Sequence, residues 1–237
     1  MIKHILNHLI AVVLLSVVHM APLQAAPQQA LSRVLDQLTP ENSVMLLIDY
    51  QPQYVFATHS TDIDSLVNNA AGLAKAARVF KVPIVITTIT AQAYAGPLLQ
   101  QVQAAAPNIE PIDRTIINAW RDERVAKAVR ATGRKKIVMA GLWTDSCVML
   151  PALSALAEGF EVYVVTDASG DYDLESHERA VQRLVQAGAI PITWLPVMLE
   201  WQADWSRGAT AGAVSQITRE HAAAMSAGAQ YRKAIAP

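Results

Sequence analysis

The sequence lacks several features that would define its class. It has a single cysteine, Cys147, among 237 residues, and charged side chains make up only 16% of the chain. Its 19 basic and 20 acidic side chains nearly cancel, and no basic block or acidic tail is found. This balance argues against a nucleic-acid partner and against electrostatic attachment to a membrane. Internal repeats and low-complexity linkers are also missing, so we expect one substantial domain.

Long hydrophobic runs are missing as well. The apolar run Leu9–Val18 has about ten residues, well short of the roughly 20 that span a bilayer. It follows a short segment that carries Lys3 and precedes the small residues Ala25 and Ala26. This order is typical of a secretory signal peptide. We expect cleavage after Ala25, which gives a periplasmic or secreted protein with no membrane partner; the alternative is a buried N-terminal helix.

The lone cysteine poses the central question of function. An exported protein enters an oxidising compartment, where paired cysteines usually become disulfides. Cys147 has no second cysteine in the chain to pair with. It is therefore either a small buried hydrophobe or a reactive thiol retained for chemistry. Position alone leaves both interpretations open.

Apolar runs alternate regularly with helical patterns in the rest of the chain. Strands that are apolar on both faces and alternate with helices predict a parallel sheet covered on both sides. The predicted strands are Val44–Ile48, Val82–Thr88, Thr115–Ile117, Lys136–Gly141, Val162–Thr166 and Ile190–Trp194. The predicted helices are Leu66–Phe80, Arg121–Thr132, Cys147–Glu158 and Glu175–Ala187. The fold class is therefore α/β, a three-layer αβα arrangement. An alanine-rich helical tail, residues 206–237, follows a domain that we place at residues 43–205, and residues 26–42 form a lead-in.

Three polar residues fall at or near the carboxyl ends of these strands, where ligands bind in open parallel sheets. Asp49 ends the first strand, Arg114 lies beside the third, and Cys147 opens the helix after the fourth. Asp49 is either a cap or ion-pair partner, or a base that takes the thiol proton. Arg114 is either an ordinary surface arginine, or it holds the thiolate, orients Asp49 or binds a substrate carboxylate.

The position of Cys147 in the first turn of a predicted helix favours chemistry in two ways. The positive end of the helix dipole is expected to lower the thiol pKa. The unpaired amides of that turn can also receive the oxyanion of a tetrahedral intermediate.

Several motifs together resemble the isochorismatase-like cysteine hydrolases, and the YcaC-type subgroup in particular. The main one is Gly141-Leu142-Trp143-Thr144-Asp145-Ser146-Cys147-Val148. The others are Ile117-Asn118-Ala119-Trp120, Ala131-Thr132-Gly133, Pro151-Ala152-Leu153-Ser154-Ala155 and Val165-Thr166-Asp167-Ala168-Ser169-Gly170. The resemblance covers about residues 43–205.

The resemblance implies a six-stranded fold, a homo-oligomer and a catalytic triad of Asp49, Arg114 and Cys147. Arg114 stands where much of the family has lysine, which keeps the positive charge but removes a neutral amine. The resemblance also implies a cis peptide between Leu142 and Trp143. It further implies that the amides of Trp143 and Cys147 form the oxyanion hole.

Two further expectations concern ligands. The Asp-x-His pair of the metal-binding nicotinamidases is missing after the second strand, and His59 stands alone, so neither a metal nor another cofactor is expected. The substrate is expected to be a small molecule. Its pocket is assigned to Tyr50, Gln51, Tyr54, Asn118, Trp120 and Trp143.

The sequence thus predicts a metal-free hydrolase that cleaves a small amide or related C–N bond through an acyl-thioenzyme. Three alternatives remain. The first is a binding protein without catalysis on the same fold. The second is a redox thiol that cycles through sulfenic acid. The third is cleavage of a vinyl ether, with the cysteine as a bystander.

Overall fold

The computed structural model describes residues 35–235. The predicted signal peptide, residues 1–25, lies outside the described residues. The same holds for residues 26–34 of the lead-in.

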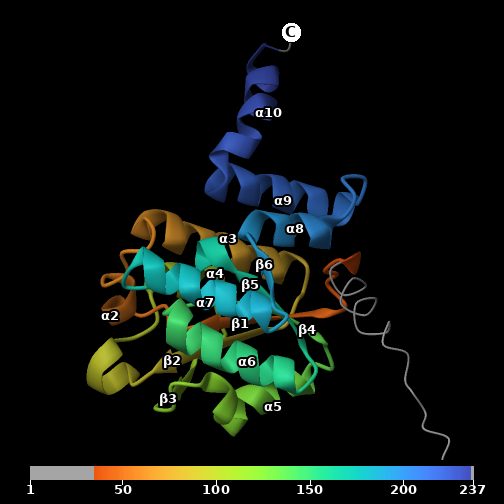
Figure 1. Cartoon of the computed structure of the whole chain (residues 1–237). Helices are drawn as coiled ribbons and strands as arrows, with labels where there is room; N and C mark the ends of the chain where they lie inside the picture. Colours follow the sequence, from red (N-terminus) through yellow and green to blue (C-terminus); the bar gives the residue numbers. More distant parts are fainter. Residues whose placement is uncertain (1–34, 236–237) are drawn as a thin grey trace, which may run out of the picture.

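A six-stranded, wholly parallel sheet forms the centre of the molecule, in the order β3-β2-β1-β4-β5-β6 (Figure 1). The strands are β1 Ser43–Ile48, β2 Ile84–Ile89, β3 Ile112–Arg114, β4 Lys136–Gly141, β5 Glu161–Val165 and β6 Ile190–Ile192. This arrangement confirms the predicted six-stranded α/β fold. The central strands β1 and β4 pair along their whole length, from Ser43 opposite Lys136 to Ile48 opposite Gly141.

Helices cover both faces of the sheet (Figure 1). One face carries α3 Ile63–Val79, α4 Gln100–Ala105, α8 Trp194–Gln202 and α9 Gly208–His221. The other carries α5 Glu123–Ala131, α6 Met149–Ala157 and α7 Leu174–Gln186. A short helix, α2 Pro52–Val55, follows β1 closely, and Pro52 opens it, as proline is suited to do.

The central strand β1 serves two separate cores because its side chains alternate between the two faces. Met45 and Leu47 pack with α3, α8 and α9, whereas Leu46 and Ile48 pack with α5, α6 and α7. All four are fully buried, and such burial contributes about 1.5–3 kcal/mol for each large side chain. A strand that is apolar throughout is therefore what this position between two helical layers requires.

Short helical turns of the π or 3₁₀ type connect several of the strands to the helices that follow them. They are η1 Ala91–Ala95, η2 Ala119–Arg121, η3 Thr144–Val148 and η4 Thr166–Ala168. We predicted one helix from Cys147 to Glu158, but Cys147 lies in the wide π-turn η3, and the regular helix α6 begins at Met149.

Three predicted strands differ from the structure by two or more residues at one end. The second begins at Ile84 instead of Val82. The third strand is Ile112–Arg114, not Thr115–Ile117. The β-branched run at 115–117 is misleading because Ile116 and Ile117 are 43% and 54% exposed. The last strand ends at Ile192, and Trp194 instead begins α8, which the sequence did not predict.

The alanine-rich tail forms two helices that differ in environment. α9 places Val214 and Ile217 in the core beside α3. The final helix, α10 Ala223–Ile235, projects from the body and leaves Tyr231 and Ile235 exposed (Figure 1). Within residues 35–235, we find no helix that combines the length and the apolar character needed to cross a membrane.

Candidate active site

The site begins with Asp49, the residue directly after β1. Its backbone turns into the left-handed region with φ 57°, a conformation that aspartate tolerates better than most residues. The Asp49 amide donates to the carbonyl of Thr87 at 3.0 Å, and the Thr87 hydroxyl donates to Oδ1 of Asp49 at 3.1 Å. The carboxylate is fully buried, so these contacts aim it along the edge of the sheet rather than into solvent.

Arg114 reaches Asp49 from β3, across the intervening strand β2. Its Nη2 donates to Oδ2 of Asp49 at 2.5 Å, and neither side chain is exposed. Its Nη1 donates to the carbonyl of Ile116 at 2.6 Å. The long arginine side chain reaches past the intervening strand, and its planar fork serves both acceptors at once. Nε of Arg114 is buried, and among residues 35–235 it has no hydrogen-bond partner.

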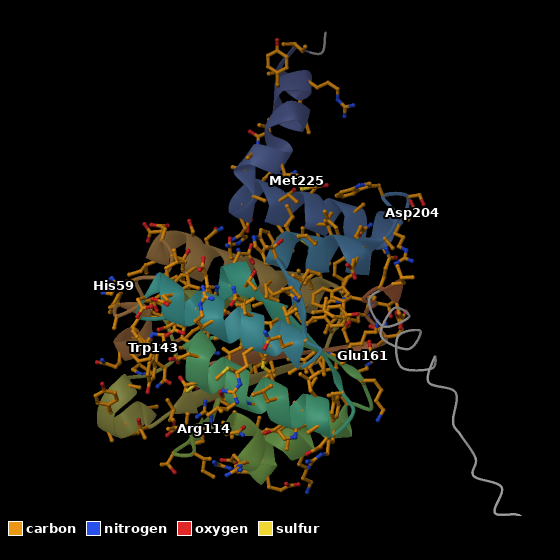
Figure 2. The ribbon with its side chains drawn as sticks, viewed as in Figure 1. His59, Arg114, Trp143, Glu161, Asp204 and Met225 are labelled. Atoms are coloured by element: carbon orange, nitrogen blue, oxygen red, sulfur yellow. The ribbon has the colours of Figure 1, made fainter. Side chains whose placement is uncertain are left out.

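Cys147 completes the cluster from the opposite side. It is 5% exposed and packs with the core of α5, α6 and α7, and its side chain lies within electrostatic reach of both Asp49 and Arg114. Arg114 and Trp143 lie at the carboxyl edge, and Glu161, at the start of β5, lies at the opposite edge (Figure 2). The structure thus brings together the three residues that the sequence predicted for the triad, although Cys147 is more buried than a surface nucleophile.

Burial sets the charge state of this cluster. It raises the pKa of the Cys147 thiol to about 12, and the charge of Asp49 adds to this effect, while Arg114 partly offsets it. Burial also raises the pKa of Asp49, against the lowering effects of Arg114 and the hydrogen bonds from Cys147 and Thr87. The predicted depression of the thiol pKa by the helix dipole was therefore wrong for the resting protein.

The cluster consequently holds one positive and one negative charge. A second anion beside Asp49 would be unbalanced in a buried site, and burying an unpaired charge is costly. Burial, which raises the pKa of the Cys147 thiol to about 12, keeps the proton on sulfur at rest.

The turn around Cys147 also defines where a substrate oxygen can bind. The bond between Leu142 and Trp143 is cis, as the resemblance implied. Four amides in this turn already donate to protein oxygens, those of Thr144, Asp145, Ser146 and Val148. Within the described part of the chain, the Trp143 amide has no such partner and the Cys147 amide has none outside the turn; these are the two amides that the resemblance implied for a substrate oxygen. Their role as an oxyanion hole stays a prediction.

Aromatic rings lie beside the cluster. The Trp143 ring meets Tyr54 edge-on, with centroids 5.1 Å apart, and Tyr172 at 5.5 Å. Its indole nitrogen donates to the carbonyl of Tyr54 at 3.2 Å. Burial raises the pKa of Tyr54 to about 12, and electrostatic interactions with Cys147 and Asp49 add to this effect, so this ring lies within electrostatic reach of the site. The sequence analysis missed Tyr172, although it follows the end of β5 at the same edge.

Four assigned pocket residues are corrected, because each has a structural role. Tyr50 is fully buried in the core of α3 and α8, and its hydroxyl donates to the carbonyl of Ala168. Both ends of the Gln51 amide are held by the main chain at Ile89 and Gly96.

The other two corrected residues lie near α6. Trp120 packs edge-on against Phe160 and donates to Glu158 at 2.7 Å, beyond the far end of that helix. Asn118 caps the turn η2 and donates to Ser154 at 3.0 Å. A large polar or aromatic side chain near a strand end is therefore insufficient to assign a pocket.

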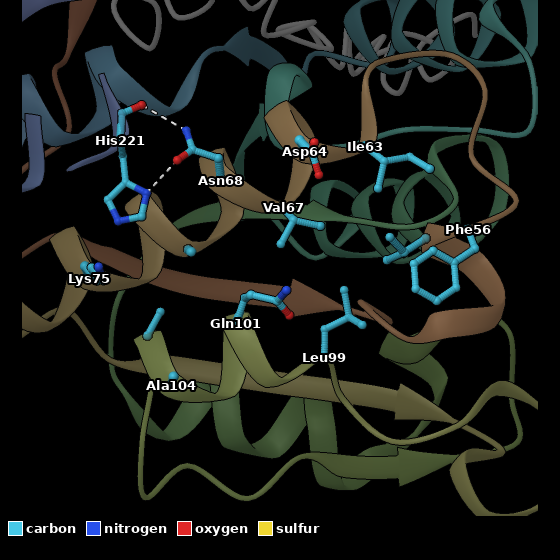
Figure 3. Close-up of a pocket in the computed structure, with 13 residues that line it drawn as sticks. Phe56, Ile63, Asp64, Val67, Asn68, Lys75, Leu99, Gln101, Ala104 and His221 are labelled. Carbon is cyan, nitrogen blue, oxygen red and sulfur yellow. Dashed lines mark hydrogen bonds between the residues drawn. The ribbon is translucent and has the colours of Figure 1, made fainter. Parts of the chain in front are cut away.

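A separate groove of ≈ 670 Å³ runs between α3 and α4, and none of the triad residues lines it (Figure 3). At one end, His221 exchanges hydrogen bonds with Asn68, and at the other lie Leu99 and Phe56. Within residues 35–235, no group of three or more His, Cys, Asp or Glu side chains is arranged to hold a metal ion.

Comparisons with known proteins show the family to which the chain belongs. The isochorismatase domain model matches residues 43–195. The sequence is 39% identical over 170 residues to the probable hydrolase YcaC of Escherichia coli K12, covering 71% of this chain and 82% of that protein.

Two crystal structures are also similar. The Escherichia coli YcaC gene product, described as an octameric hydrolase of unknown specificity, matches with a TM-score of 0.80 at 33% identity, over 84% of this chain and 98% of that one. YcaC from Pseudomonas aeruginosa, solved with hexane-2,5-diol and covalent acrylamide, matches with a TM-score of 0.78 at 35% identity, over 83% and 96%. The chain therefore belongs to the isochorismatase family of hydrolases.

Proposed function

We propose that the protein hydrolyses a small, neutral amide or related C–N substrate, with Cys147 as the nucleophile. The observation that carries the proposal is the buried contact of the Cys147 thiol with Asp49, whose charge is balanced by Arg114. A carboxylate held within reach of a thiol in a dry site can act as its general base.

The first half of the reaction forms an acyl-thioenzyme. Asp49 accepts the thiol proton as sulfur attacks the carbonyl carbon, so that a C–S bond forms and the carbonyl oxygen becomes an oxyanion. The amides of Trp143 and Cys147 stabilise that oxyanion. The intermediate collapses, the C–N bond breaks, and Asp49 returns the proton to the leaving nitrogen.

The second half releases the acid. Asp49 accepts a proton from water as the water oxygen attacks the thioester carbon. The C–S bond breaks, the proton returns to sulfur, and the carboxylic acid leaves. The thiol is protonated both before and after the cycle, which fits its raised pKa. Arg114 balances whichever member of the pair carries the negative charge.

The charge of the site limits the class of substrate. Arg114 is already paired with Asp49 and with the carbonyl of Ile116, so no cation of the cluster is left for a substrate carboxylate. The neighbouring groups are the aromatic rings of Tyr54 and Trp143. These features favour a neutral substrate with an apolar group and disfavour a dicarboxylate vinyl ether such as isochorismate.

Two observations bear on the alternative roles of Cys147 as a structural or a redox-active residue. The Pseudomonas aeruginosa relative holds covalent acrylamide, a small neutral electrophile that reacts with thiolates, which supports a nucleophilic rather than a purely structural cysteine. Sensitivity to peroxide increases with thiolate character and exposure, and Cys147 at rest has little of either. A redox role is therefore less well supported than hydrolysis.

A substrate screen tests the proposal. The purified protein is assayed with neutral small amides, ureides and nitriles, and with analogues that carry a carboxylate, beside the Cys147→Ala and Cys147→Ser variants. We expect turnover of at least one neutral compound by the wild type only. Turnover that survives Cys147→Ala would exclude the cysteine mechanism, and a preference for carboxylates would exclude the neutral-substrate assignment.

We also propose that the chain forms a homo-oligomer. The support is the octameric state of the Escherichia coli YcaC and the exposed side chains of α10, among them Tyr231 and Ile235. Native mass spectrometry of the full chain beside a chain that ends after His221 tests this. A monomer for the full chain would contradict the proposal, and an unchanged oligomer for the shortened chain would exclude α10 as the contact.

Export to the periplasm or outside the cell is a further proposal, and it rests on the order of residues in 1–25 alone. Cell fractionation with N-terminal sequencing tests it. We expect the exported form to begin at Ala26, and retention of the uncleaved chain in the cytoplasm would refute it.

A further inference from the structure

The segment Gly170–Tyr172, called the strap here, crosses the carboxyl edge of the sheet after η4. The Gly170 carbonyl accepts hydrogen bonds from both the amide and the hydroxyl of Thr144, at 2.9 and 3.0 Å. Gly170 also pairs with Leu142 as an isolated bridge. The strap is thus bound to the turn that carries Cys147.

The same segment binds the loop after α2 on its other side. The Asp171 carbonyl accepts from the amides of His59 and Ser60, at 2.9 and 3.1 Å, and the Asp171 amide donates to the Ser60 hydroxyl at 2.8 Å. Packing is close as well, since a Cβ on Gly170 would lie 2.7 Å from Cγ2 of Thr58. Thr58 in turn accepts from the indole of Trp143.

The Asp171 carboxylate is at the centre of these contacts. It is fully buried, and it accepts from the Asp145 amide at 2.9 Å through Oδ2 and from the Tyr172 amide at 3.0 Å through Oδ1. A buried carboxylate is costly unless it is bound, and here both oxygens bind main-chain amides next to the site. Asp145 lies two residues before Cys147, and Tyr172 contacts Trp143 edge-on.

We propose that Asp171 is a positioning residue for Cys147. Its carboxylate fixes the Asp145 amide and therefore the start of the turn η3, so that the thiol stays against Asp49 and the Cys147 amide faces the substrate carbonyl. The main chain of Asp171 binds the loop after α2, which follows Tyr54 and contains Thr58, and so keeps that loop in a fixed position relative to the turn η3. The inference rests on the proposed role of Cys147 as the nucleophile.

Several titratable groups surround Asp171. Asp145 lies on η3, Asp173 precedes α7, His59 lies on the loop after α2, and His177 of α7 contacts Thr144 at 2.8 Å. Burial raises the pKa of Asp171 to about 6, against the lowering effect of the hydrogen bonds from the Asp145 and Tyr172 amides. The charges of Asp145 and Asp173 add smaller increases. Protonation of Asp171 below about pH 6 removes the anionic acceptor, and the turn is expected to loosen.

The experiment measures the alkylation rate of Cys147 by acrylamide in the full-length folded protein, which needs no known substrate. The test variant is Asp171→Asn. The matched control is Asp173→Asn, which removes the same charge two residues away, where the side chain caps α7 by accepting from the Ser176 amide at 2.7 Å. Circular dichroism and thermal unfolding are recorded for each variant.

We expect Asp171→Asn to react about tenfold more slowly than the wild type, and Asp173→Asn to stay within about twofold, in line with the loss of one charge-assisted hydrogen bond. The wild-type rate should fall more steeply below pH 6 than the rate of Asp171→Asn. Equal rates and equal pH profiles for the two variants would overturn the inference, even if Asp171→Asn lowers the unfolding temperature. No labelling of the native wild type would instead overturn the proposed function itself.

Ser60→Ala covers the case in which Asp171→Asn fails to fold. It removes the hydroxyl that accepts from the Asp171 amide and leaves the carboxylate in place. We expect alkylation to be about threefold slower, from the loss of one neutral hydrogen bond. A rate equal to that of the wild type would overturn the inference.

Discussion

Replacing Asp49 by asparagine should raise the reactivity of Cys147 while lowering hydrolysis. In the wild type, the charge of Asp49 contributes to the raised pKa of the thiol, and it also balances Arg114. The asparagine side chain would keep the shape of the aspartate but remove its charge. Arg114 would then lack a counter-ion in a fully buried site, and the Cys147 thiolate is the group nearest to supply one.

The expected change in the thiol pKa follows from the charge interaction between Cys147 and Asp49. Two unit charges about 4 Å apart interact by about 4 kcal/mol at an effective dielectric constant near 20. At about 1.36 kcal/mol for each pH unit, the thiol pKa should fall by about three, to about 9. The thiolate would then make up about 1% of the population at neutral pH, and alkylation should rise by about 100-fold or more. Hydrolysis should fall by about 10²–10⁴, because the leaving nitrogen loses its proton donor.

The assay combines the two rates. Alkylation by acrylamide is followed against pH by mass spectrometry, and hydrolysis is followed with whichever neutral substrate the screen identifies. Asp113→Asn is the matched control, because Asp113 precedes Arg114 on β3 but is exposed and bonds Thr88 instead. If Asp49→Asn slows both alkylation and hydrolysis while remaining folded, the charge of Asp49 does not raise the thiol pKa, and the predicted gain in thiolate is wrong.

Three further outcomes follow from the same contacts. Thr87→Val removes a hydrogen bond that lowers the pKa of Asp49, so the pKa of Asp49 should rise further and the acid limb of the pH profile of hydrolysis should move to higher pH. An unmoved acid limb would show that this hydrogen bond does not affect the catalytic protonation state of Asp49. Arg114→Lys keeps the charge but loses one of two fork contacts, and we expect about a tenfold loss of kcat with the fold retained, whereas an unchanged kcat would mean that only charge matters. Gly141→Ala would place a Cβ 2.3 Å from the carbonyl oxygen of Ile48. Because neither central strand can shift, chemical denaturation should show a loss of about 3 kcal/mol in the free energy of unfolding. An unchanged free energy of unfolding would contradict the tight packing of β1 against β4.

The sequence predicted the features that local pattern controls. The apolar run before Asp49 and the run Lys136–Gly141 specify fully buried strands, and the ends of parallel strands meet at one edge of the sheet. Asp49 and the turn of Cys147 could therefore be placed together before any coordinates. Arg114 was found partly through the family resemblance, because the strand that carries it has only three residues.

What the sequence did not predict depends on distant contacts. Tyr50 and Trp120 look like pocket residues until the partners of their polar atoms, Ala168 and Glu158, are known. The thiol pKa was predicted in the wrong direction because burial, which opposes the helix dipole, is not readable from the position of Cys147 along the chain. Asp171 was missed for the same reason, since its partners lie in segments far from it in sequence.

The most direct measurement is peptide mapping of Cys147 after treatment with acrylamide, for the native protein and for the same protein unfolded in urea. If the thiol shares its proton with Asp49 and faces an accessible pocket, the native protein is labelled at Cys147, and Asp49→Asn accelerates that labelling. A thiol that stays unlabelled in the native fold but reacts freely in urea would be a packing residue, and the cysteine mechanism would be excluded.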